Sequence, residues 1–156
     1  MKLLRVNTTK LETRYEDLPA DWKMLGGRGL SAKIMRTEVP PQADPLGSEA
    51  KLVIAAGPLA GTLAPSCGRT SVGGKSPLTQ GIKEANAGGP VGQDLDKLGI
   101  RAIVLEGQPK DDKLYILSIS KDGALLKDGE AYRGLGALKP MPWLIPCGKN
   151  TMTRFQ

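Results

Sequence analysis

The sequence predicts an α+β fold in which strands outnumber helices. Short apolar or alternating runs, bounded by glycine, proline, asparagine or aspartate, recur along the chain and are typical of strands. Apolar residues at helical spacing stand out in two segments, residues 29–38 and 89–98. The chain has 156 residues, which is enough for one domain that buries a core without disulfides or metals.

The first part of the chain is expected to form a hairpin and then a helix. Residues 3–6 and 13–15 are predicted strands, and a polar turn at residues 7–10 joins them. The apolar positions of residues 29–38 fall on one helical face, and the two prolines that follow end the helix. Residues 41–49 then form a connector rich in turn-forming residues.

The middle of the chain is expected to supply two strands. Residues 52–56 form a continuous apolar run, which predicts a strand covered on both faces, and Gly57 and Pro58 end it. Residues 69–74 are predicted to form another strand, with Val72 pointing inward.

The last predicted elements are a helix, two strands and a hairpin turn. The helix at residues 89–98 ends at Gly99, because glycine favours the backbone conformation that stops a helix. A strand at residues 102–105 follows. Residues 114–119 alternate as in a strand, and residues 121–123 are a hairpin turn that leads into its partner.

The net charge of +6 raises the question of nucleic-acid binding. Four basic residues and no acidic ones lie in residues 133–156, so most of the excess charge is in the tail. Aromatic residues make up 4% of the chain, which leaves few side chains on which bases could stack. No apolar run reaches the ~18 residues of a membrane helix, and the N-terminus lacks the apolar centre of a secretion signal. We expect no nucleic-acid or membrane partner and a cytoplasmic location.

The two cysteines, Cys67 and Cys147, are far apart and belong to no C-x-x-C pattern, and the chain has no histidine. Zinc or a complete iron–sulfur site within the chain is therefore not supported. A disulfide between Cys67 and Cys147 is geometrically possible, but a cytosolic setting favours free thiols.

Three short patterns resemble known sites and have ordinary explanations. Residues 27–32 match G-x-G-x-x-A of a dinucleotide-binding turn, but no buried strand precedes them, which favours a glycine-rich helix entry. Residues 74–76 imitate the end of a phosphate-binding P-loop, but the glycine spacing is wrong and Pro77 blocks the helix. Asp94 and Asp96 point to different faces of a helix, as on a solvated surface.

The glycine-rich stretch at residues 51–92 carries a resemblance to a known family. Together with the flanking motifs, in their order and spacing, it resembles the N-terminal domain of the tungsten-containing aldehyde ferredoxin oxidoreductases over residues 3 to about 132. The motifs are LRVN at residues 4–7, LGGRGL at 25–30, DPL at 44–46, KLVIAAGPLAG at 51–61, AP at 64–65, GR at 68–69, KSPLT at 75–79, ANAGG at 85–89 and GIRAIVLEG at 99–107.

This resemblance implies an α+β domain with two antiparallel sheets and short helices beside a pterin site. Family members hold tungsten, or sometimes molybdenum, on two pterins whose phosphates are bridged by magnesium. The implied cofactor-binding residues here are Arg69, Asn86, Ala87 and Gly88, with the main-chain carbonyl of Asn86 as a magnesium ligand. Glycines let backbone N–H groups face phosphate oxygens, and an arginine supplies a planar charged fork. Lys75 belongs to the pattern either as a binding residue or as one that shapes its turn, and Arg69 could instead form a surface ion pair.

The resemblance also implies functions for which this sequence lacks residues. In the family, an aldehyde and water give a carboxylic acid, and electrons leave through a [4Fe-4S] cluster to ferredoxin. The ligands of that cluster and the later glycine cluster of the family are absent from this sequence, and the catalytic groups are unknown here. We therefore expect an incomplete domain at residues 1–132 that is inactive alone. Its partner could be a second copy in a homodimer or a complementing chain.

Residues 133–156 form a proline-rich, divergent tail. Its prolines interrupt any helical or central-strand pattern. It is expected to be a disordered terminus or the product of a reading-frame change. An inactive truncated or frameshifted fragment, and a small basic binding module, are the alternative interpretations of the whole chain.

Overall fold

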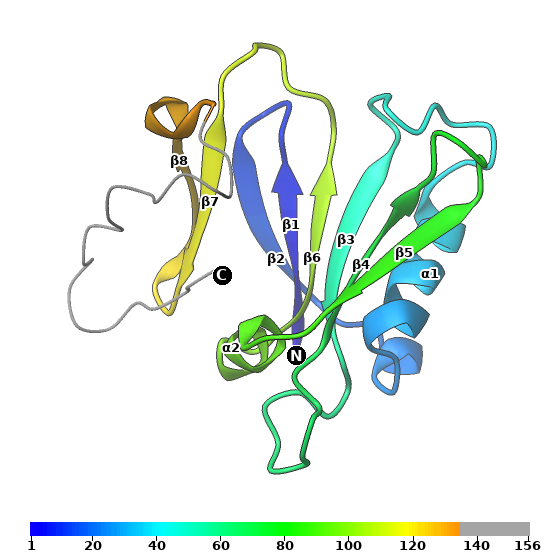
Figure 1. Ribbon diagram of the computed structural model, residues 1–156, viewed down its shortest axis with the longest axis vertical. Helices are drawn as coiled ribbons and strands as arrows, with labels where there is room; N and C mark the ends of the chain where they lie inside the picture. Colours follow the sequence, from blue (N-terminus) through cyan, green and yellow to red (C-terminus); the bar gives the residue numbers. More distant parts are fainter. Residues whose placement is uncertain (135–156) are drawn as a thin grey trace. The chain divides into compact units, whose positions relative to one another are not determined.

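The computed structural model describes residues 1–134, and the predictions made for residues 135–156 lie outside this part of the chain. The chain divides into two compact units, Met1–Lys110 and a second unit that begins at Asp111. Figure 1 shows the sheet and helices of the first unit and the hairpin of the second.

The first unit is built on one mixed sheet. Its strands are β1 (Lys2–Asn7), β2 (Glu12–Asp17), β3 (Lys51–Ala56), β4 (Thr70–Lys75), β5 (Ile82–Ala87) and β6 (Ile100–Glu106). They lie in the order β2-β1-β6-β3-β4-β5, and neighbours run antiparallel except β1 and β6, which are parallel. The predicted α+β class, the first hairpin and the presence of two sheets are confirmed. The larger sheet is mixed because the first strand lies beside β6.

One face of this sheet is covered by α1 (Gly27–Glu38), which contacts β3, β4 and β5. Leu30 and Ile34 are completely buried, as their helical spacing predicts. A Cβ on Gly73 of β4 would lie 2.8 Å from Ser31 Oγ, so the helix can pack this closely because β4 has no side chain there. The core between helix and sheet consists of Leu3, Leu18, Leu30, Ile34, Met35, Val39, Ala43, Val53, Ala55, Ala102 and Val104.

A second helix, α2 (Val91–Lys97), contacts β3 and β6. Of the apolar face expected for this helix, Leu95 is buried, and Val91 and Leu98 are half-buried. Gly99 follows with a φ of +72°, a left-handed conformation that favours glycine, and the chain then enters β6. The predicted helix and its stop are confirmed.

The second unit contains the antiparallel hairpin of β7 (Tyr115–Ser120) and β8 (Gly123–Asp128). Gly123 has a φ of +141°, so the predicted turn depends on glycine at this position. A short 3-10 helix, η2 (Glu130–Tyr132), follows the hairpin. Hydrogen bonds from the Arg133 side chain and the Leu114 main chain lower the pKa of Glu130 to about 2.

Three details of the larger sheet differ from the sequence-based expectations. Leu52 in β3 is 43% exposed, so this strand is not fully covered on both faces. Val72 is only half-buried, whereas its neighbour Ser71 is buried, because Ser71 is on the side of the sheet that faces α1. The strand β5 was not expected, because its sequence lacks an alternating apolar pattern and most of its residues are exposed.

Candidate cofactor-binding site

The glycine-rich segments meet at one end of the larger sheet. Thr70 at the start of β4 pairs with Ala56 at the end of β3 and with Ala87 at the end of β5. The loops beyond these strand ends are therefore neighbours. A Cβ on Gly92 in α2 would lie 2.6 Å from the carbonyl oxygen of Gly68, closer than real side chains come. The start of α2 thus packs directly on the backbone that leads into β4.

The predicted site residues Arg69, Asn86 and Gly88 lie together at this end. Arg69 Nε donates a hydrogen bond to Asn86 Oδ1, and Arg69 Nη2 donates to the main-chain oxygen of Asn86 at 3.4 Å. A Cβ on Gly88 would lie 3.7 Å from Arg69 Nη1. All three residues are exposed, and so is Ala87 between them. The structure therefore brings the predicted group together on an accessible surface, while its binding role remains a prediction.

The polar network extends along β4 and β5 through Glu84, which motif analysis missed. Ser71 Oγ donates to Glu84 Oε1 at 2.7 Å, and Asn86 Nδ2 donates to the same oxygen at 3.4 Å. Arg28 Nε at the start of α1 lies 3.6 Å from Glu84 Oε2. The hydrogen bond from Ser71 is the main reason that the pKa of Glu84 is lowered. Because its side chain bonds Asn86, Glu84 helps to orient a predicted site residue.

Lys75 shapes its turn rather than facing this group. Its Nζ donates to the main-chain oxygens of Pro41 and Ala43, the latter at 2.6 Å. These bonds tie the end of β4 to the connector that follows α1. Of the two roles left open for Lys75, the structure supports the structural one.

The dinucleotide-like pattern at residues 27–32 is a glycine-rich helix entry, as expected. A 3-10 helix, η1 (Ala20–Trp22), precedes it instead of a strand. A Cβ on Gly26 would lie 2.6 Å from Pro58 N, so glycine is needed there for packing. The P-loop-like residues 74–76 lead through a turn into a strand, not a helix.

The remaining candidates have structural environments. Asp94 pairs with exposed Lys97 at 3.1 Å on the surface of α2, as the solvated interpretation predicts. Cys67 is half-buried and its thiol is free. Within residues 1–134, no three His, Cys, Asp or Glu side chains are grouped so that they could hold a metal ion. The same part of the chain has no helix long and apolar enough to cross a membrane.

A second polar region lies at the opposite end of the strands and was not predicted. Arg5 forms a bidentate pair with Glu38, at 2.6 and 2.7 Å, and its Nε lies 2.7 Å from Glu16. Lys51 Nζ bridges Glu38 and Glu106 at 2.7 and 3.0 Å. Burial tends to raise the pKa of Glu38, but the hydrogen bonds and charges of Arg5 and Lys51 outweigh it and lower this pKa to about 2.

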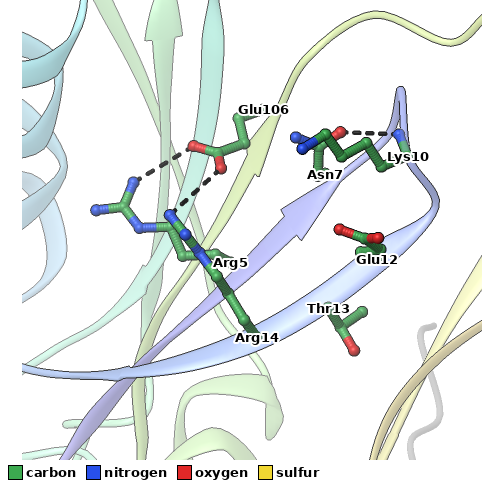
Figure 2. Close-up of a pocket in the computed structure, with 7 residues that line it drawn as sticks. All are labelled: Arg5, Asn7, Lys10, Glu12, Thr13, Arg14 and Glu106. Atoms are coloured by element: carbon green, nitrogen blue, oxygen red, sulfur yellow. Dashed lines mark hydrogen bonds and ion pairs between the residues drawn. The ribbon is translucent and has the colours of Figure 1, made fainter.

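This second region borders a small polar pocket, shown in Figure 2, in which Glu106 lies between Arg5 and Arg14. Arg5, which lines the pocket, and Lys51 are both paired with Glu38 and Glu106, so these side chains form an ion-pair network that joins β1, α1, β3 and β6. The pocket is lined by Arg5, Asn7, Lys10, Glu12, Thr13, Arg14 and Glu106.

Comparisons with known proteins agree with the fold and identify the family that the chain resembles. Residues 3–144 match the family described as aldehyde ferredoxin oxidoreductase, N-terminal domain. Tungsten-containing aldehyde ferredoxin oxidoreductases from Pyrococcus furiosus and Thermococcus kodakarensis are 47% and 44% identical to this chain over 131 residues, which is 81% of it. The chain spans about a fifth (21%) of the length of these relatives.

A solved structure gives the same result. The chain is similar to the active site complex BamBC of benzoyl coenzyme A reductase, with a TM-score of 0.79 and 33% identity. This similarity covers 85% of this chain and 20% of that one. A match that includes most of the chain, with sequence and fold in agreement, establishes the family: the chain belongs to the aldehyde ferredoxin oxidoreductases, and it corresponds to their N-terminal domain.

Proposed function

We propose that this chain provides the N-terminal, pterin-binding part of an oxidoreductase that converts an aldehyde and water into a carboxylic acid. The electrons would leave through a [4Fe-4S] cluster to ferredoxin. The observation that supports this proposal is the grouping of Arg69, Asn86 and Gly88 at one exposed end of the sheet. The relatives named tungsten-containing aldehyde ferredoxin oxidoreductases supply the reaction class.

The residues present fit a phosphate-bearing pterin. Gly88 leaves open space beside Arg69 Nη1, and this nitrogen has no hydrogen-bond partner among residues 1–134. A guanidinium that is already held at Nε and Nη2 can offer its remaining nitrogen to an anion without first being ordered. The absence of side chains at residues 88 and 89 lets main-chain N–H groups approach the same anion.

Asn86 would serve the cofactor through its main-chain oxygen. That oxygen accepts one long hydrogen bond, at 3.4 Å, from Arg69. Because a carbonyl oxygen has two lone pairs, it can also bind a hard cation such as magnesium. Arg69 and Asn86 would thus offer a positive fork and a cation ligand side by side to a phosphate that is bound together with magnesium.

The bound tungsten or molybdenum pterin would supply the two-electron redox chemistry. The residues of this chain would hold and orient the cofactor by its phosphate side. The substrate cavity and the electron exit are assigned to the parts of the relatives that this chain does not span. The partner that we propose is therefore a polypeptide that contains those parts, since a second copy of this chain would not supply them.

The proposal is tested by cofactor retention. The 156-residue chain is produced anaerobically in a host supplied with tungstate or molybdate, and metal and pterin are measured per mole of protein. Arg69→Lys keeps the charge but loses the fork, so we expect at least a ~10-fold lower cofactor content than in the wild type. Arg14→Lys, at an exposed arginine remote from Gly88, is the matched control. Equal cofactor content in all three proteins would refute the proposal.

A further inference from the structure

Arg101 is a buried arginine with unsatisfied hydrogen-bonding capacity. It is the second residue of β6 and is only 7% exposed. Its Nη1 donates to the carbonyl oxygen of Gly57 at 2.8 Å. Within residues 1–134, Arg101 Nε is the one buried side-chain nitrogen or oxygen without a hydrogen-bond partner, and no carboxylate forms an ion pair with this guanidinium.

A comparison with Arg5 in the same sheet shows how unusual this is. Arg5 is equally buried, at 8% exposed, but it is held by the carboxylates of Glu16 and Glu38. A guanidinium stays charged at any ordinary pH, so it cannot escape burial by losing a proton. A buried charge without a counter-ion is strongly unfavourable. Of the two arginines that are buried within residues 1–134, one is neutralised by carboxylates and the other has no counter-ion.

The position of Arg101 connects it with the glycine-rich end of the sheet. Gly57, which accepts its hydrogen bond, lies against the next loop: a Cβ there would be 3.6 Å from the Cys67 carbonyl oxygen and 4.0 Å from that of Arg69. Arg101 is thus separated by one residue from the segment that carries Arg69. Its Nε and Nη2 form an edge with two parallel N–H donors, the geometry that matches two oxygens of an oxyanion.

We propose that this edge of Arg101 binds a phosphate group. The phosphate could come from the pterin cofactor or from free inorganic phosphate, and for the cofactor the inference rests on the proposed function. Arg69 would then hold the anion from the exposed side and Arg101 from the interior. Two short segments lie near Arg101: α2, which contacts β6, has seven residues, and residues 57–69, which include its hydrogen-bond partner Gly57, contain neither helix nor strand. A displacement of either one would give phosphate access to the edge.

The test measures thermal stability of the 156-residue chain against phosphate and pyrophosphate at constant ionic strength. We expect the melting temperature of the wild type to rise with phosphate. Arg101→Met removes the unpaired charge, so without phosphate it should melt higher than the wild type, and its response to phosphate should be lost. Arg14→Met at an exposed arginine should keep the wild-type response.

A second variant keeps the test decisive if Arg101→Met does not fold. Arg101→Lys retains the charge but not the paired donors, and we expect its dissociation constant for phosphate, from calorimetry, to rise at least ~10-fold. The inference is overturned if the wild type does not respond to phosphate, or if both Arg101 variants respond as the wild type does.

The melting temperature of the cofactor-loaded chain distinguishes the two sources of the phosphate. If the cofactor phosphate occupies Arg101, added inorganic phosphate will not raise the melting temperature of the cofactor-loaded chain any further. If inorganic phosphate does raise that melting temperature, free phosphate is the ligand of Arg101. The two proposals fail separately. Cofactor that is lost in Arg69→Lys but retained in Arg101→Lys and Arg101→Met would refute cofactor phosphate at Arg101 and leave the proposed function standing. Equal cofactor content in the wild type and Arg69→Lys would refute that function, while the phosphate response would still decide Arg101.

Discussion

Arg69 donates hydrogen bonds to both oxygens of Asn86, through Nε to the side chain and through Nη2 to the main chain. The two donors lie in one guanidinium plane, so the pairing fixes the orientation of the fork. It also holds the third nitrogen beside Gly88. The two residues are separated by 17 positions in sequence, and their meeting depends on the pairing of β4 with β5.

Asn86→Ala tests this orientation. The substitution removes the side-chain acceptor but keeps the main-chain oxygen, so Arg69 should become mobile while the fold persists. A hydrogen bond to a charged group contributes about 1.5 to 3 kcal/mol, which predicts a loss of pterin affinity of roughly 10- to 150-fold. Cofactor content measures the loss, and Gln42→Ala, at an exposed loop residue, is the control. Retained affinity with an unchanged fold would show that Asn86 does not orient Arg69.

Gly92→Ala tests the backbone packing beneath the site. The new Cβ would lie 2.6 Å from the Gly68 carbonyl oxygen, and a backbone atom cannot move aside easily. We expect the free energy of unfolding to fall by about 1–3 kcal/mol in urea titrations. Gly29→Ala is the matched control, because its Cβ would lie 3.9 Å from Leu25 Cδ2, an ordinary contact, and alanine favours the helix. Similar effects of both substitutions would contradict this account.

The ion pairs of Glu38 predict a dependence of stability on pH. The pKa of Glu38 is lowered to about 2 in the folded chain, below the ordinary glutamate value of 4.5. The stabilisation is therefore fully present above about pH 4.5 and is lost as the pH falls toward 2. We expect Glu38→Gln to cost on the order of 2 kcal/mol at pH 7 and to weaken this dependence.

Urea titrations between pH 2 and pH 7 measure this effect. Glu12→Gln, at an exposed carboxylate of β2, should leave the profile as in the wild type. A Glu38→Gln profile parallel to that of the wild type would mean that other groups carry the dependence on pH.

The 156-residue chain produced alone is predicted not to oxidise aldehydes. It spans about 21% of the length of its tungsten-containing relatives, and two-electron chemistry needs an enclosed substrate site and an exit for electrons. The assay is aldehyde-dependent reduction of a viologen dye under anaerobic conditions, with a mock preparation from the same host. Turnover above the mock that disappears in Arg69→Ala would show that this chain holds a complete site.

Sequence reasoning found the elements whose apolar pattern has a clear period. Leu30 and Ile34 gave the helix α1, and Gly99 and Gly123 marked a helix stop and a hairpin turn because both have positive φ values. The edge strand β5 has no such pattern, since in its sequence IKEANA a lysine and a glutamate are adjacent and an asparagine lies between two alanines. Its existence depends on main-chain pairing with β4, which leaves no periodic signal in its side chains.

The candidate site could be predicted only from the family resemblance. Arg69 and Asn86 belong to no local pattern, and only the ordered set of motifs placed them together. The ion-pair network was missed for a related reason. Arg5, Glu38 and Glu106 come from three distant segments, and charges spaced in this way resemble ordinary surface residues until strand order is known. The polar sequence of β2 likewise gave no indication that Glu16 pairs with a buried cation.

The central position of β6 has a consequence for how the chain folds. In the order β2-β1-β6-β3-β4-β5, the strand that is synthesised last joins a two-stranded hairpin to a three-stranded meander. Until residue 106 has left the ribosome, no strand pairing connects these pieces to each other. Arg69 and Asn86 meet within the meander and need only local contacts, whereas Arg101 arrives with β6. Contacts between β1 and β6 span about a hundred residues, so their loop-closure entropy should make this insertion the slow step of folding.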